Sequence, residues 1–290
     1  MKKILIFLFL FFISCAKNDS RSDAYGNFEA TEITISAQAQ GELLNFDITE
    51  GVVVEKNQIL GQIDTTVLHI KKQQVLDNIR LMTMKIHSAE FNLQAMRRQH
   101  ELLGKEQNRI LELFKNEATT EQNLDKITTE FDVTGLKIQA LEAEILSITI
   151  QKQTLNNQLN EIKENLDKTR IMNPVKGTIL TKYKETHELV SIGMPLYKIA
   201  NLENMYLKIY ISADQLDDIK IGQQVEVLVD KNLESTYQLF GNITWISATS
   251  EFTPKNIQTR KERIDQVYAV KVLVKNNGLI KIGMPGEVNF

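Results

Sequence analysis

The sequence predicts a multidomain α+β protein, in which a long antiparallel α-helical coiled-coil hairpin splits a small β domain and a small β-barrel follows. Three observations lead to this fold class. Two β-like segments share a pattern at a constant offset of 136 residues, a proline-free stretch of heptads lies between them, and apolar and polar residues alternate after residue 200.

The first residues have the features of a secretory signal. Lys2 and Lys3 precede an apolar run at residues 4–13, which is too short to span a membrane but has the length of a signal-peptide core. The single cysteine, Cys15, follows this run and a small residue, an arrangement that resembles a bacterial lipoprotein signal. We therefore expect residues 1–14 to be a signal peptide, Cys15 to be lipidated and residues 15–30 to form a linker. The alternative is an ordinary secretory signal with an incidental cysteine.

The two β-like segments read GELLNFDITEGVVVEKNQILGQID from Gly41 and GTILTKYKETHELVSIGMPLYKIA from Gly177. Both contain short strands rich in β-branched residues, separated by turns. Two matching halves so far apart in sequence predict one small domain, built from residues 31–64 and 169–200, with an insertion between them. The aligned apolar pairs are Leu44 with Leu180, Val54 with Val190, Leu60 with Leu196 and Ile63 with Ile199.

The insertion, residues 65–168, carries two series of seven-residue spacing in each of its halves. In each half, eleven of the fourteen positions are apolar. The first half has Leu68, Val75, Met82, Ala89, Met96, Leu103 and Ile110, with Lys72, Ile79, Ile86, Leu93, His100, Gln107 and Phe114. The second half has Leu124, Phe131, Ile138, Ile145, Lys152, Leu159 and Leu166, with Ile127, Thr134, Leu141, Ile148, Leu155, Ile162 and Thr169. A 3.5-residue period held over about seven heptads predicts a coiled coil.

A short polar turn at residues 116–118 joins the two halves, so the helices must pack antiparallel. Each helix has about 50 residues, which gives the hairpin a length of roughly 70–75 Å. Thr119 and Gln122 have the spacing of a capping box at the start of the second helix. After residue 200, the segments NMYLKIYIS, QQVEVLVD, YQLFGNITWIS, QVYAVKVLV and GEVNF read as half-buried strands, which predicts a small β-barrel over residues 201–290.

This order of segments resembles the HlyD-type periplasmic adaptors, or membrane fusion proteins, of bacterial efflux and secretion systems. The resemblance is carried by ATEITISAQAQGEL before the hairpin, RIMNPVKGTIL after it and ISATSEFTPKNIQTRKERIDQVYAVKV near the end. The last tract is similar to the subgroup that works with ABC-type export permeases. The resemblance implies that the split domain is lipoyl-like (a barrel-sandwich hybrid), without the lysine turn of a cofactor carrier.

The resemblance also implies a function. The protein would be a non-enzymatic adaptor in the periplasm, held at the inner membrane, which links an inner-membrane exporter to a TolC-type outer-membrane channel. It would form a homo-oligomeric ring, with six copies as the expected number. The family's hairpin tips share an arginine, a leucine four residues on and a serine seven further; Arg109, Leu113 and Thr120 meet this pattern, with threonine in place of serine. They would contact the channel; alternatively, Thr120 only starts a helix and Arg109 is a solvated residue.

Other functions find less support in the sequence. A net charge of −3 without clustered Lys and Arg argues against nucleic-acid binding, and one cysteine excludes an internal disulfide. His69, His87, His100 and His187 lack the partners of a metal site, and no P-loop or dinucleotide fingerprint is present. We therefore predict no enzyme, cofactor or metal. A structural lipoprotein that tethers envelope layers is the runner-up, and a biotinyl or lipoyl carrier is a weaker third. The loop at residues 251–265 is either an exposed connection or a contact with the transporter or a neighbouring copy.

Overall fold

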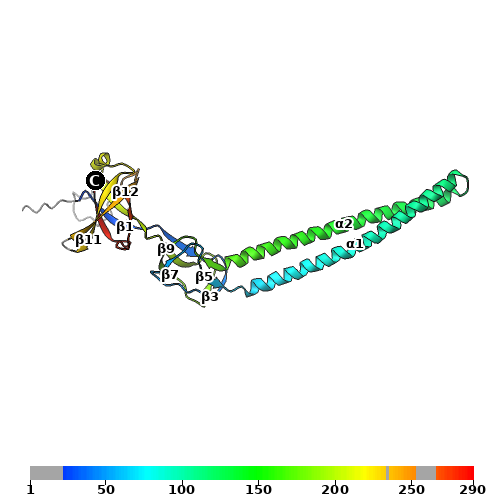
Figure 1. The fold of residues 1–290 in the computed structure, drawn as a ribbon, viewed down its shortest axis with the longest axis horizontal. Helices are drawn as coiled ribbons and strands as arrows, with labels where there is room; N and C mark the ends of the chain where they lie inside the picture. Colours follow the sequence, from blue (N-terminus) through cyan, green and yellow to red (C-terminus); the bar gives the residue numbers. More distant parts are fainter. Residues whose placement is uncertain (1–21, 233–234, 253–265) are drawn as a thin grey trace, which may run out of the picture.

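The computed structural model describes residues 22–232, 235–252 and 266–290. The molecule is elongated, with a β-barrel at one end, a second β domain beside it and a long helical hairpin that reaches away from both (Figure 1). This architecture confirms the fold class expected from the sequence. Cys15 and most of the loop at residues 251–265 lie outside the described residues.

Two four-stranded sheets form the split domain, in the orders β2-β9-β7-β4 and β6-β5-β3-β8. Strand β4 of the first half pairs with β7 of the second, and β8 of the second half pairs with β3 of the first. Neither half can therefore complete its sheets alone. The strands are β2 Glu32–Ser36, β3 Gly41–Asn45, β4 Val53–Val54, β5 Ile59–Ile63, β6 Arg170–Met172, β7 Gly177–Lys182, β8 Leu189–Val190 and β9 Pro195–Ala200.

The internal repeat is visible in the backbone itself. Gly51 and His187 both have positive φ angles, 84° and 71°, and so do Asn57 and Gly193, at 64° and 87°. Both pairs keep the offset of 136 residues. The repeat also extends to the core, although its first apolar pair is shifted by one residue, since Leu44 is 46% exposed. The buried pairs are Leu43 with Ile179, Val54 with Val190, Leu60 with Leu196 and Ile63 with Ile199.

Helices α1 (Thr66–Lys115) and α2 (Glu121–Lys168) form the hairpin. Every position of the four heptad series is buried or half-buried except Phe114, which is exposed. Ala89, Leu93, Thr134 and Leu159 are the most deeply buried residues of the two helices. The heptad pattern therefore identified the seam between the helices, and we call these series the seam.

Polar contacts across the seam fix the register of the two helices. His100 Nδ1 lies 2.8 Å from the Thr134 hydroxyl, which itself donates to the Phe131 carbonyl at 2.7 Å. Because that hydroxyl proton is already used, Nδ1 is the donor. The His100 ring also stacks on Phe131, with 4.0 Å between ring centroids. Nearer the tip, Gln107 Nε2 donates to the Thr128 hydroxyl at 3.2 Å.

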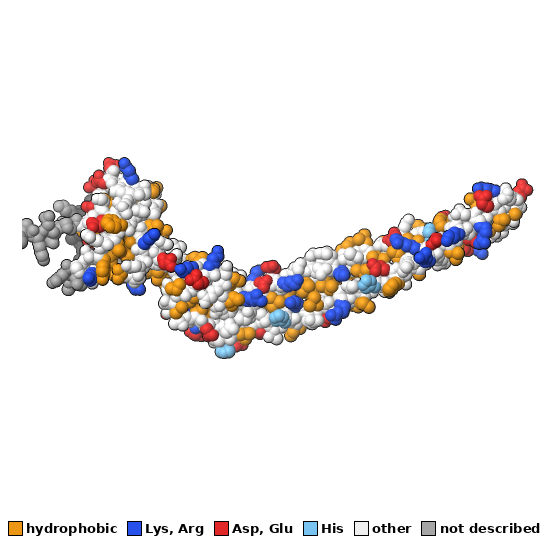
Figure 2. Space-filling model, viewed as in Figure 1, with side chains coloured by type: hydrophobic (Ala, Val, Ile, Leu, Met, Phe, Trp, Pro, Cys, Tyr) orange, Lys and Arg blue, Asp and Glu red, His pale blue; other side chains and the backbone are white. Residues whose placement is uncertain are grey.

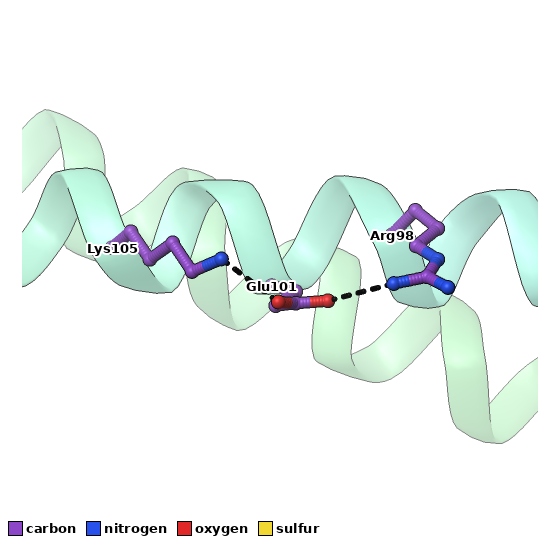
Figure 3. A network of polar contacts seen from close by, with 3 residues as sticks. All are labelled: Arg98, Glu101 and Lys105. Atoms are coloured by element: carbon purple, nitrogen blue, oxygen red, sulfur yellow. Dashed lines mark hydrogen bonds and ion pairs between the residues drawn. The ribbon is translucent and has the colours of Figure 1, made fainter.

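Charged side chains lie on part of the exposed face of α1. Glu101 lies between Arg98, at 3.4 Å, and Lys105, at 2.9 Å (Figure 3). The hydrogen bond from Lys105, with the charges of Lys105 and Arg98, lowers the pKa of Glu101 from its ordinary 4.5. A lowered pKa means that this group stabilises the helix at neutral pH, and that the contribution is lost as the pH falls through the lowered value. All three side chains are exposed, so the contribution is small.

The barrel closes through β10 Asn204–Ser212, which pairs with both β1 and β14. The order of its sheet is β10-β1-β15-β11-β12-β14-β13. Its core is rich in β-branched and aliphatic side chains, such as Ile209, Val227 and Val272. The other strands are β1 Ala24–Glu29, β11 Gln224–Asn232, β12 Ser235–Ile246, β13 Glu251–Phe252, β14 Gln266–Lys275 and β15 Pro285–Asn289, with a 3-10 helix at Asp214–Asp218.

Strand β1 differs from the expectation that residues 15–30 form a linker. It pairs antiparallel with β10 and β15, and Ala24 and Phe28 enter the barrel core. Its alternation is weak in sequence because Gly26 takes an inward position, where a Cβ would lie 1.8 Å from the Lys208 carbonyl oxygen. The chain thus contributes one strand to the barrel, forms the first half of the split domain and the hairpin, and returns through the second half of the split domain to the barrel.

Candidate functional site: the hairpin tip

The turn at the tip begins where α1 ends in a Schellman motif. The amide of Glu117 donates to the Phe114 carbonyl at 2.9 Å, and the amide of Ala118 donates to the Leu113 carbonyl at 2.8 Å. Glu117 takes the left-handed conformation that this motif requires, with a φ of 61°. The side-chain amide of Asn116 also caps α1, donating to the Glu112 carbonyl at 2.8 Å.

Helix α2 starts at Thr120 rather than at the predicted capping box of Thr119 and Gln122, which is wrong by one residue. Thr120 has the extended backbone of an N-cap, and its hydroxyl accepts from the Asn123 amide at 3.4 Å. Thr119 instead accepts from the Asn123 side chain at 3.2 Å. The Schellman motif fixes where the chain reverses, so the second threonine is the first residue placed to cap α2.

The three residues expected to contact a channel are spread over the last turns of α1 and the start of α2. The Leu113 side chain is 41% exposed, and its carbonyl anchors the turn. Thr120 is exposed and caps α2. Arg109 lies on α1, one turn before Leu113. Its side chain is 69% exposed and forms an ion pair with Glu106 of the same helix.

Two apolar residues that the sequence analysis did not expect at the tip surface share this exposure. Leu111 is 36% exposed and Phe114 is 38% exposed, so with Leu113 they give α1 an apolar end. Phe114 was assigned to the seam, and this assignment is wrong. It lies one residue before the end of α1, where α2 has barely begun and cannot cover it. Phe114 is the last member of its heptad series, and this position could have indicated that no partner helix covers it.

A second apolar pattern runs outside the seam. Val67, Leu81 and Leu102 are separated by whole heptads and are 51–67% exposed, and on α2 Leu136 and Ile150 are two heptads apart. Figure 2 shows hydrophobic side chains along much of the visible face of the hairpin. We call the exposed large apolar side chains of the two helices that lie outside the seam and before the tip the hairpin flank. Its members are Val67, Ile70, Leu81, Met84, Phe91, Leu102, Val133, Leu136, Leu146 and Ile150.

Within residues 22–232, 235–252 and 266–290, no helix is both long and apolar enough to cross a membrane. Nor does any group of three or more His, Cys, Asp or Glu side chains in those ranges have an arrangement that could hold a metal ion.

Comparison with known proteins places this architecture in a family. Residues 31–200 match the family described as "RND MFP, barrel-sandwich hybrid domain", and residues 201–289 match "LcnD-like, C-terminal domain". The first match covers the split domain and the hairpin, which is more than half of the chain. The chain belongs to the membrane fusion protein family. Members of this family are non-enzymatic periplasmic adaptors of efflux systems, which oligomerise and work with inner-membrane transporters and outer-membrane channels.

Individual relatives are similar over nearly their whole length. A UPF0194 membrane protein of Yersinia enterocolitica is 23% identical, with 94% of this chain and 90% of the relative covered. The UPF0194 membrane protein YbhG of Salmonella gallinarum is 21% identical, with 95% and 90% covered.

Two solved structures share the fold. The crystal structure of MacA from Actinobacillus actinomycetemcomitans has a TM-score of 0.55 at 20% identity, with 91% of this chain and 76% of MacA covered. A MacA chimera that carries the α-hairpin of Pseudomonas aeruginosa MexA has a TM-score of 0.53 at 20% identity, with 91% and 78% covered.

Proposed function

We propose that this protein is the adaptor that links an inner-membrane exporter, of the ABC type, to a TolC-type outer-membrane channel. The observation that carries the proposal is the hairpin. Its helices have 50 and 48 residues, so it extends roughly 75 Å from the β domains and ends in an exposed tip. A spacer of this length has its use in a periplasmic bridge between two membranes.

At the tip, Leu113 and its exposed neighbours Leu111 and Phe114 supply the apolar contact to the channel. Arg109 offers a rigid fork of donors for carbonyl or carboxylate groups, and its ion pair with Glu106 holds it in place until then. Thr120 keeps its capping bond, in which its hydroxyl oxygen accepts from the Asn123 amide, and the same hydroxyl can donate to the channel. The tip therefore combines the apolar anchors and charged edges that protein interfaces use.

The hairpin flank is the surface on which neighbouring copies pack. Its heptad spacing matches that of a second coiled-coil seam, and its side chains are too exposed to contribute to a lone hairpin. When the α1 part of the flank of one copy packs on the α2 part of the flank of the next, the hairpins form a closed tube. We propose a ring of six.

The barrel end faces the inner membrane. Lipid on Cys15 anchors the chain there, because the seven peptide links from Cys15 to Ser22 span at most about 25 Å. The tract at residues 246–272 is the basis for an ABC-type permease as the partner, whereas the family description that matches residues 31–200 names RND systems. Co-purification with an RND transporter alone would contradict the ABC assignment.

The channel contact is tested by charge at the tip. Leu113→Asp places a carboxylate in the apolar contact, and Thr154→Asp, exposed on α2 far from the tip, is the matched control. We expect chemically cross-linked cells to yield the channel and the transporter with Thr154→Asp, but only the transporter with Leu113→Asp. Recovery of the channel with both variants would reject the tip as its contact. Recovery of no transporter with either would favour the envelope-tethering lipoprotein.

A further inference from the structure

A pocket of about 600 Å³ lies between the two helices at the base of the hairpin, next to the split β domain. We call it the base pocket. It is remote from the tip, and none of the residues discussed as channel contacts reaches it. Its walls are Gln62, Thr65, His69, Lys72, Lys163, Leu166, Asp167, Thr169 and Arg170.

The lining of the base pocket is positively charged. Lys72, Lys163 and Arg170 contribute three cations against the single carboxylate of Asp167. Asp167 offsets only part of this charge, because its oxygen lies 3.9 Å from Arg170 Nη1, at the limit of an ion pair. Neither lysine has an ion pair with any residue that the structure describes. A pocket of this charge attracts anions.

Lys72 also breaks the pattern of the seam. It holds a seam position and is half-buried, where the heptad pattern calls for an apolar side chain. The register that joins Gln107 to Thr128 places Lys72 level with Lys163 on the opposite helix. Lys163 is exposed and lies outside the seam, but both lysines line the same pocket, where like charges repel. Breaks of a local rule without a visible gain are typical of functional sites.

Thr65 adds a polar group to the pocket wall. It is the N-cap of α1 and makes no side-chain capping bond. The neighbouring Asp64 lies outside the pocket lining and caps α1 in its place, accepting from the amide of Thr66 at 2.9 Å and from its hydroxyl at 2.7 Å. The hydroxyl of Thr65 is therefore a further donor on the pocket wall.

We propose that the base pocket binds a phosphate group, which bridges Lys72 on α1 to Lys163 on α2 and to Arg170, just after the end of α2. A tetrahedral phosphate has enough acceptor oxygens to take charge-assisted hydrogen bonds from three directions at once, whereas a lone carboxylate has two. Bound there, it removes the repulsion between the lysines and fixes the two helices where they enter the β domain. The proposal does not depend on the adaptor function.

The test is calorimetric titration of the full chain in detergent with two probes at constant ionic strength. Inorganic pyrophosphate represents a free phosphate ligand, and glycerophosphoglycerol represents a phospholipid headgroup. We expect at least one probe to bind, and Lys72→Met or Lys163→Met to weaken its binding at least tenfold. Lys152→Met is the matched control, because Lys152 is also half-buried on the seam but lies outside the pocket. The Lys152→Met variant should bind the probe as tightly as the parent chain does.

The probe that binds identifies the source of the phosphate. Binding of neither probe, or an equal loss with Lys152→Met, would overturn the proposal. So would a loss of self-association in Lys72→Met without phosphate binding to the parent chain, because the pocket would then receive a carboxylate from a second copy. None of these outcomes bears on the channel contact, which Leu113→Asp tests separately.

Discussion

Asn173 is the residue that ties the second half of the split domain to the first. It is fully buried, and its side-chain amide donates to the carbonyl of Glu55 at 2.9 Å and to that of Val175 at 2.5 Å. The side-chain oxygen of Asn173, Oδ1, accepts from the Tyr197 hydroxyl at 3.1 Å. Burial raises the pKa of Tyr197 to about 12, so the hydroxyl keeps its proton and remains a donor at every physiological pH.

Tyr197→Phe should therefore destabilise the split domain. Among the described residues, it removes the one donor that reaches the Asn173 side-chain oxygen and leaves a buried acceptor unpaired, at a cost of about 1–3 kcal/mol. Tyr183→Phe is the control, because Tyr183 is 40% exposed and the change should cost less than about 0.5 kcal/mol. Urea denaturation of the two variants measures the difference. Equal midpoints would show that the buried bond contributes nothing.

At this scale the sequence indicated types of residue better than their exact roles. Paired threonines and a following amide side chain predicted a helix start, but which threonine caps α2 depends on where the Schellman motif at Glu117 reverses the chain. Asn173 lay within the tract RIMNPVKGTIL that carried the family resemblance, yet its bonds join residues 118 positions apart. No local pattern contains such a partner.

At the scale of elements, the seam of the hairpin can be tested with one buried charge. Ile86 is half-buried on the seam, and Ile86→Asp places an uncompensated carboxylate between the helices, at a cost of more than about 2 kcal/mol. Ile148→Asp on α2 should behave alike. Ser88→Asp, two residues along and exposed, should leave the thermal midpoint of far-UV helicity nearly unchanged. If all three melt together, the seam is misplaced.

The two glycines of the hairpin have opposite environments. At Gly135 a Cβ would lie 3.5 Å from His100, an ordinary contact, so Gly135→Ala should stabilise the helix by about 1 kcal/mol. At Gly104 a Cβ would lie 3.0 Å from Phe131, whose ring is held by its stacking on His100. Gly104→Ala should therefore gain nothing or lose stability. A thermal melt in which both variants gain equally would mean that Gly104 has no packing role.

Elements with a strong period were predictable, and those set by distant partners were not. The heptads of α1 and α2 marked the seam because a coiled coil is a local pattern repeated many times. Strand β1 was missed because Gly26 interrupts its alternation and its partners, β10 and β15, come from the other end of the chain. The hairpin flank was equally missed, since only the packed hairpin shows which apolar residues the seam leaves uncovered.

At the scale of the whole molecule, we propose that the tip of the hairpin contacts an outer-membrane channel. Ala118 is a suitable probe position, because it is exposed and only its backbone amide contributes to the turn. Thr154 is exposed on the same hairpin, and at ~1.5 Å per residue it lies roughly 50 Å from the tip. The sequence could predict the reach of the hairpin from its heptads, but not its partner, because the exposed tip residues have ordinary capping roles as well.

The most direct measurement is photo-cross-linking in intact cells, with a benzophenone maleimide on Ala118→Cys and on Thr154→Cys as the control, and with Cys15 retained as the anchor. We predict capture of an outer-membrane channel from position 118 and none from position 154. Capture of only further copies of this chain, or of peptidoglycan-associated proteins, from position 118 would contradict it and identify the hairpin as a structural tether.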